Sequence, residues 1–217
     1  MGTLGFRNGG AGRQMRRSFF VDKDYRRIIE CYDSGSFFCD GPTCLMYREA
    51  FYRYGRNARF ILTVRRDSQL WVDSLKRHNL YAGAKNKTRW IFGRFYPHGF
   101  EDEFKAYYER HNKDVVQFFE DQNAADLLLV LRVDEPDAVA RISKFLGVSF
   151  PIVEFPHENA SSTSRRGLSN LAKKLYNQVA QAVYAFVAPH IPVRIRQPAR
   201  PIDLSGGRLP NAESNQA

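Results

Sequence analysis

The chain has 217 residues, of which 43% are hydrophobic and 14% are aromatic. This composition excludes a disordered polymer and supplies enough apolar side chains for one domain with its own core. The sequence has no run of about 18 apolar residues, so no integral membrane span is expected. The formal net charge of +10 favours anionic partners: nucleic acid, a membrane surface, or a small molecule that carries phosphate or sulfate.

Three cysteines, Cys31, Cys39 and Cys44, cannot all pair with one another, and their spacing fits no zinc motif. The basic first 20 residues also lack the apolar segment of a secretory signal. We therefore expect reduced thiols, a cytoplasmic protein and no metal site.

The first third of the chain predicts an arm, a helix, a strand and a second helix. Residues 1–18 are rich in Gly and Arg and are interpreted as a flexible arm. Residues 24–32 predict a short helix, and the apolar run 36–40 between glycines predicts a buried strand. Pro42 fits the first turn of a helix that runs to about Tyr54, before Gly55.

The middle of the chain carries the clearest strand, residues 59–64, whose continuous apolar character is typical of a parallel strand. A helix is expected over 68–78, followed by a long connection at 79–99 and a long amphipathic helix over 101–120.

A second apolar strand is predicted at 127–132, followed by a helix over 136–145. Two strand–helix units in succession indicate an α/β fold with a parallel sheet flanked by helices. A helix over 168–186 follows, and residues 189–217 are expected to form a disordered tail. The predicted domain is therefore 19–188.

The end of the best strand offers an anion site. In an open parallel sheet, ligands bind beyond the carboxyl ends of the strands, which is where Arg65 and Arg66 lie. Asp67 or Ser68 can cap the next helix, whose free N–H groups attract anions. Ser74 follows about two turns into that helix, so an arginine and a hydroxyl can converge on one phosphate.

This segment, Val-Arg-Asp-x-x-x-Trp-x-x-Ser, resembles the element of PAPS-dependent sulfotransferases that binds the 3′-phosphate of 3′-phosphoadenosine 5′-phosphosulfate (PAPS). The resemblance assigns Arg66 and Ser74 to that phosphate. Arg65 is an additional arginine, for which a surface charge or salt bridge is favoured.

Further segments resemble the bacterial and fungal sulfotransferase-like branch of that family, over roughly residues 20–160. They are Phe38–Pro42 with Leu45–Glu49, Tyr108–Asn112 with the apolar positions after it, Leu127–Val130, Phe145–Val148, and Phe155–Asn159. The resemblance implies a P-loop NTPase-like sulfotransferase fold that uses PAPS.

One departure concerns the phosphosulfate loop with which the family opens, which resembles Arg-Thr-Gly-Thr. The sequence contains neither this motif nor GxxxxGK[ST], and Leu4–Arg7 resembles the stretch after the helix that follows the loop. We therefore expect the first strand to be missing and activity to be weak or absent, since such loops stabilise the leaving phosphate. A truncated start, a gene fragment and a non-catalytic relative all remain open.

The remaining candidates have competing interpretations. Asp40 is either the general base for the acceptor or a capping residue before Pro42. Arg165, Arg166 and Gly167 resemble a late segment near the 3′-phosphate, or form a solvated basic loop. His111 is favoured as a structural histidine.

The aromatic cluster at 90–100 could cover the acceptor or stack on nucleic acid, but no nucleic-acid motif accompanies it. The helix at 168–186 could lie on a membrane, although its Gln and Asn residues favour docking on the domain.

The leading hypothesis is transfer of a sulfuryl group from PAPS to a hydroxyl or amine of a small-molecule or carbohydrate acceptor, with no nucleic-acid partner. The alternative is a non-catalytic sulfotransferase-like binding or scaffold module.

Overall fold

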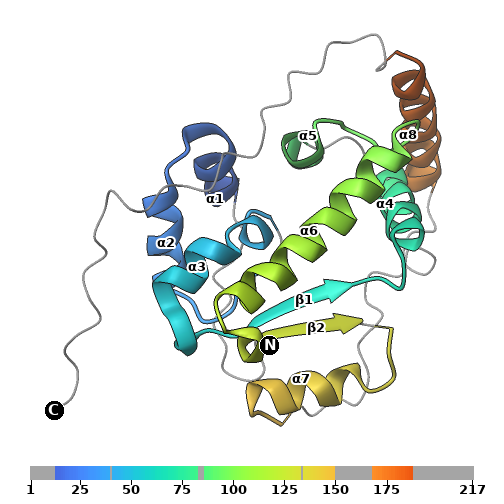
Figure 1. Ribbon diagram of the computed structural model, residues 1–217. Coiled ribbons are helices and arrows are strands. Elements are labelled where there is room, and N and C mark those ends of the chain that lie inside the picture. The colour runs from blue at the N-terminus through green and yellow to red at the C-terminus, as the bar shows by residue number, and fades with distance from the viewer. Residues whose placement is uncertain (1–12, 40, 83–85, 133, 150–167, 188–217) are drawn as a thin grey trace, which may run out of the picture.

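The computed structural model describes residues 13–39, 41–82, 86–132, 134–149 and 168–187 (Figure 1). The described elements are α1 (Arg13–Arg17), a π-helix (Ser18–Asp22), α2 (Tyr25–Asp33), α3 (Tyr47–Tyr54), β1 (Phe60–Val64), α4 (Ser68–Ala82), α5 (Asn86–Phe92), α6 (Glu101–Asp121), β2 (Leu128–Arg132), α7 (Ala138–Leu146) and α8 (Leu168–Val187). Short 3₁₀ turns at Thr43–Leu45, Gly55–Asn57 and Ala125–Leu127 precede α3, β1 and β2.

The two strands form a parallel pair, as the sequence predicts. Phe60 pairs with Leu128 at one end of the register and Val64 with Arg132 at the other. The described chain is thus a helix-rich α/β fold around a small two-stranded parallel sheet.

Helices cover both faces of this sheet, because alternate strand residues point to opposite sides. Phe60 and Leu62 pack toward α3 and α6, whereas Ile61 and Leu131 pack with α7. Figure 1 shows α6 running across the sheet on one side and α7 on the other. Burial on both faces explains why the strands are apolar without alternation.

Aromatic contacts join α6 to α3 and β1. Phe119 is fully buried, with its ring centroid 4.8 Å from that of Phe60 and 5.6 Å from that of Phe51. Phe118 packs edge-on to Tyr47 at 5.4 Å. The helix predicted at 101–120 is therefore confirmed, with its aromatic stripe in the core.

A second core lies in the N-terminal helices. Met15 of α1, Ile28 and Tyr32 of α2, and Met46 are buried together. Asp24 caps α2 by accepting a hydrogen bond from the Arg27 N–H at 3.2 Å. The domain boundary after residue 18 stays a prediction, and Met15 on its N-terminal side belongs to this core.

Two expected elements differ from the structure. Residues 36–39 contain only an isolated bridge at Phe37, because the packing of Phe38 on Tyr32, 4.5 Å between centroids, places the segment against α2. Residues 79–99 are not one long connection: α4 continues to Ala82, and α5 follows. Trp90 of α5 stacks on Phe20 at 5.1 Å, a tertiary contact that periodicity cannot reveal.

Candidate functional site

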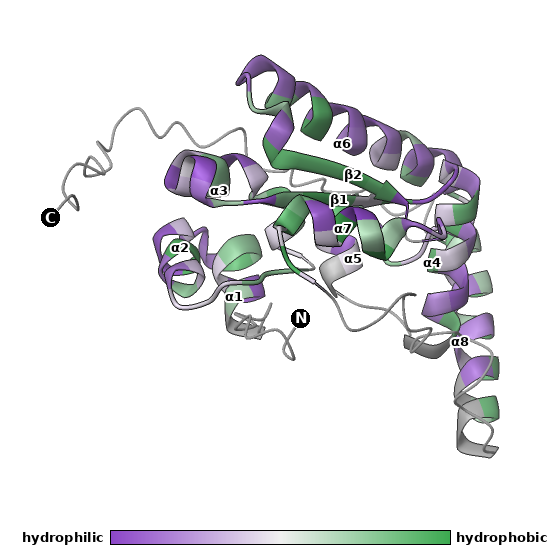
Figure 2. Cartoon of the chain, turned by 90° about the horizontal axis from the view of Figure 1, so that it is seen from below, coloured by the Kyte–Doolittle hydropathy of each residue, from purple (hydrophilic) through white to green (hydrophobic). Residues whose placement is uncertain are grey.

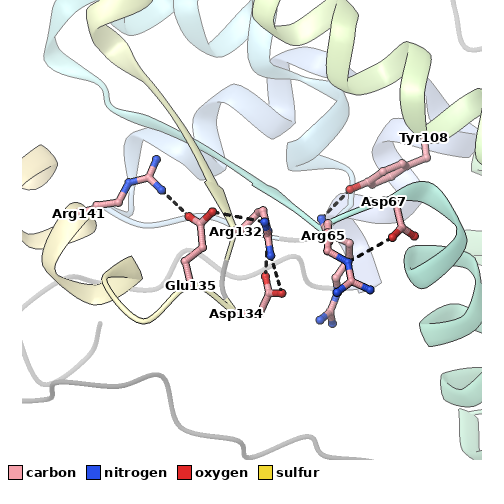
Figure 3. A network of polar contacts seen from close by, with 8 residues as sticks. Arg65, Asp67, Tyr108, Arg132, Asp134, Glu135 and Arg141 are labelled. Atoms are coloured by element: carbon pink, nitrogen blue, oxygen red, sulfur yellow. Dashed lines mark hydrogen bonds and ion pairs between the residues drawn. The ribbon is translucent and has the colours of Figure 1, made fainter.

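The carboxyl ends of the two strands lie side by side and carry three arginines, Arg65, Arg66 and Arg132. We call this end of the sheet the arginine edge, and Arg65–Arg66 the arginine segment. Val64 is paired with Arg132, so Arg65 and Arg66, which follow β1, lie next to the last residue of β2. Figure 3 shows this edge of the sheet. The sequence predicted Arg65 and Arg66 here but missed Arg132, although its place at the end of the second predicted strand was a usable signal.

The segment after β1 is fixed by α6. The Arg65 backbone N–H donates a hydrogen bond to the Tyr108 hydroxyl at 2.7 Å (Figure 3). The Tyr108 ring in turn stacks on Trp71 of α4, with 4.7 Å between centroids and 19° between planes. Tyr108 therefore connects the arginine segment to α6, to which it belongs, and to α4 through Trp71.

The N-terminus of α4 is also anchored. The Asp67 carboxylate accepts a hydrogen bond from the Leu70 N–H at 2.7 Å, and its carbonyl accepts one from the Trp71 N–H at 3.2 Å. The Ser68 hydroxyl donates to a Glu109 oxygen at 2.5 Å. The expected cap is confirmed, and Asp67 is the residue that forms it.

Arg66 is exposed at this helix end. Its Nε lies 3.5 Å from an Asp67 oxygen, with the two side chains 64% and 46% exposed. Exposed pairs of this kind contribute about 0–1 kcal/mol. An incoming phosphate can therefore compete with Asp67 for the guanidinium.

Arg132 belongs to a chain of ion pairs on the β2 side. It lies 3.1 Å from Asp134 and 3.7 Å from Glu135, which also pairs with Arg141 at 2.5 Å (Figure 3). The hydrogen bond from Arg132 lowers the pKa of Asp134, and the charge of Arg65 adds to that effect. The carboxylates balance most of the positive charge at this edge.

Ser74 lies on α4 and is half-buried. In the part of the chain that the structure describes, no hydrogen-bond partner occurs for its hydroxyl. That hydroxyl is therefore available to a ligand, and the convergence of Ser74 with Arg66 on one phosphate stays a prediction. Asp40, Arg165, Arg166 and Gly167 lie outside the described residues, and their roles stay predictions too.

Two ionisable residues, His111 and Glu49, lie among the aromatic rings of α2, α3 and α6. The His111 ring is parallel to that of Tyr107 at 6.2 Å and edge-on to that of Tyr47 at 6.2 Å, and burial lowers the pKa of His111. Burial raises the pKa of Glu49, whose Oε2 is buried with no hydrogen-bond partner among the described residues. Sequence reasoning used Glu49 only as part of a motif and missed its environment.

Part of the aromatic cluster at 90–100 is packed, and its role as a cover for the acceptor stays a prediction. Arg94 lies 3.7 Å from the Phe100 ring centroid and pairs with Glu103 at 3.2 Å. Tyr96 and Phe100 are buried. This packing leaves those rings unavailable for stacking on bases.

The described ranges contain neither a metal-binding cluster nor a membrane-crossing helix. No group of three or more His, Cys, Asp and Glu residues suited to a metal ion occurs there. Within the same ranges, no helix combines the length and apolar character that a membrane crossing requires.

A family model matches much of the chain. The model of the family described as "Sulfotransferase domain" matches residues 9–97 and again 76–164, which together span more than half of the chain. The matched region includes β1, β2 and the arginine edge. Neither the curated proteins nor the solved structures contain a significant match.

Proposed function

Because the chain belongs to the sulfotransferase domain family, we propose that it binds PAPS and serves sulfuryl transfer to a hydroxyl or amine of a small-molecule or carbohydrate acceptor. The proposal extends to a P-loop NTPase-like arrangement of the domain over residues 19–188. It also places the protein in the cytoplasm, as expected from three cysteines whose spacing fits no zinc motif.

The observation that carries the proposal is the arginine segment at the start of α4. Arg66 is exposed there and forms an exposed pair with Asp67, while the Arg65 backbone is fixed by Tyr108. A guanidinium can bind phosphate through two parallel hydrogen bonds, and the helix N-terminus adds favourable dipoles. Arg66 and Ser74 would together bind the 3′-phosphate of the donor.

The residues present fit such a donor in charge and in hydrogen-bonding capacity. The Ser74 hydroxyl has no partner among the described residues, and Arg65 adds a second guanidinium beside Arg66. Bound PAPS would supply the activated sulfuryl group. Arg165, Arg166 and Gly167 would complete the phosphate contacts, and Asp40 would accept the proton of the attacking acceptor.

A second candidate is a non-catalytic binding module, and one sequence feature favours it. The 217 residues contain no Arg-Thr-Gly-Thr motif to supply backbone N–H groups to the leaving phosphate. Loss of a single such donor costs about 3–4 kcal/mol in other enzymes. This candidate predicts nucleotide binding without sulfuryl transfer.

The test is titration calorimetry with adenosine 3′,5′-bisphosphate. We expect Arg66→Ala to weaken binding at least about tenfold, the scale of a charged hydrogen-bond pair. Arg59→Ala is the matched control, since Arg59 precedes β1 and donates hydrogen bonds to the carbonyls of Arg56 and Ala58 at the opposite end of the strand. Equal binding by wild type and Arg66→Ala would overturn the site.

A transfer assay then separates the two candidates. Wild-type protein that binds the bisphosphate is supplied with PAPS and a panel of phenols, alcohols and amines. Formation of a sulfated product supports the enzyme, whereas binding without product supports the module.

A further inference from the structure

Helix α8 packs on the domain through the buried polar residues Asn177 and Gln181 and the ring of Tyr184, and it leaves most of its apolar side chains exposed. Asn177 and Gln181 are only 4% and 2% exposed, whereas Tyr176 and Phe186 are 74% and 79% exposed. Five more large apolar residues of α8 are exposed, namely Leu171, Leu175, Val179, Val183 and Val187. This is the reverse of the pattern expected for a helix that covers a core.

Two polar groups of α8 have specific partners, whereas the buried Nε2 of Gln181 has none among the described residues. Asn177 donates a hydrogen bond from Nδ2 to the Leu80 carbonyl of α4 at 2.8 Å. The Tyr184 hydroxyl accepts one from the Phe95 N–H at 3.1 Å. These hydrogen bonds and the packing of the Tyr184 ring against Tyr96 and Phe100 set the orientation of α8, and a rotation that buried the apolar side would break them.

The exposed side of α8 is continuous. Positions 171, 175, 179, 183 and 187 recur every four residues and form one stripe along the helix, with Tyr176 and Phe186 beside it. Among the side chains of 171–187 whose burial is described, Gln178 is the only polar one that is exposed. Figure 2 shows α8 extending away from the sheet beside α4. Because the residues of the stripe are exposed, they can contact a large flat partner.

The charge of the sequence that includes and flanks α8 points to the class of that partner. Residues 159–202, which include α8, contain no Asp or Glu. The same stretch carries Arg and Lys at positions 165, 166, 173, 174, 194, 196 and 200. A cationic segment with an exposed aromatic and aliphatic helix side complements an anionic lipid surface.

We propose that α8 binds the surface of membranes that contain anionic phospholipids, lying in the interfacial plane with its apolar stripe among the acyl chains. The helix does not cross the bilayer, since its other side is occupied by α4. A second copy of the chain is a poorer occupant, because packing two α8 helices together would bring two cationic segments into contact. The basic residues supply attraction to the headgroups.

The test is co-sedimentation of the full chain with vesicles. Phosphatidylcholine vesicles are compared with vesicles that also contain phosphatidylserine, at low and high salt. Wild type is expected to bind the phosphatidylserine vesicles and to be released by salt. The triple variant Leu175→Gln/Val179→Gln/Phe186→Gln should bind at least about tenfold more weakly, since it removes apolar area from the stripe.

Val21→Gln/Tyr52→Gln is the matched control, because both side chains are exposed large hydrophobics outside α8. Its binding should equal that of wild type. All three substituted residues of the triple variant are exposed, so circular dichroism should give the wild-type spectrum.

Three outcomes would overturn the proposal. They are failure of wild type to bind phosphatidylserine vesicles, equal loss of binding in the control variant, and a lipid-free dimer in light scattering that the triple variant converts to monomer. The last outcome would assign the stripe to a second copy.

Discussion

The backbone N–H of Arg65 and the hydroxyl of Tyr108 form a 2.7 Å hydrogen bond between residues 43 positions apart. The contact joins the segment that leaves β1 to α6, so the geometry of the arginine edge depends on a helix that follows much later in the chain. Trp71, stacked on Tyr108, adds α4 to the same unit. An anion that binds Arg66 would therefore meet a segment that is already ordered.

Tyr108→Phe is expected to lower the free energy of unfolding by about 1 kcal/mol, since it keeps the ring stack and removes one hydrogen bond. Affinity for adenosine 3′,5′-bisphosphate should fall as well, because the arginine segment loses its anchor. Urea denaturation and calorimetry measure the two effects. Tyr176→Phe, at a 74% exposed position, is the control and should change neither.

Ser74→Ala tests the predicted contact with the 3′-phosphate. Wild type should bind adenosine 3′,5′-bisphosphate more tightly than adenosine 5′-monophosphate, and Ser74→Ala should reduce that preference about tenfold, the scale of a hydrogen bond to a charged group. Binding of the monophosphate should be unchanged. A variant that weakens both nucleotides equally would place Ser74 outside the 3′-phosphate site.

Glu49→Gln should change the pH dependence of stability. Burial raises the pKa of Glu49 above its ordinary value of 4.5, so the folded state holds this proton more tightly than the unfolded state. The stability that this provides is present in full below the unfolded-state pKa and is lost as the pH rises through the folded-state pKa. Glu49→Gln should therefore be more stable than wild type at neutral pH.

The measurement for Glu49 is urea denaturation of both proteins at several pH values. The advantage of Glu49→Gln should shrink toward acidic pH, where wild-type Glu49 is protonated. Glu120→Gln, at an exposed position of α6, serves as the control. An advantage that is independent of pH would show that ionisation of Glu49 is not its cause.

Asn177→Ala should loosen α8 without unfolding the domain. It removes the 2.8 Å hydrogen bond to the Leu80 carbonyl and leaves that carbonyl without this donor, at a cost of about 1–3 kcal/mol. Hydrogen exchange should accelerate in α8, while the amides of β1 and β2 keep their protection. The exposed neighbour Gln178 provides the control substitution, Gln178→Ala. Faster exchange throughout the chain would instead make α8 part of the main cooperative unit.

Local features of the sequence were sufficient for the strands and the long helices. The apolar runs at 59–64 and 127–132 predicted β1 and β2 as parallel strands, and the aromatic spacing at 101–120 predicted α6. Both follow from short-range physics, since burial on two faces requires continuous apolar residues and a helix buries every third or fourth position. The position of Arg66 at a strand end followed from the same reasoning.

Only the tertiary structure determines how the strands and helices pack against one another. The pairing of Val64 with Arg132 brought a third arginine to the predicted edge, and the bond from Arg65 to Tyr108 fixed its geometry. The Gln and Asn residues of α8 did favour docking, but only the packed structure revealed that its apolar side is left outside. The sequence records which residues are apolar, whereas competition among partners for each surface, settled by hydrogen bonds such as that of Asn177, determines which side of a helix is buried.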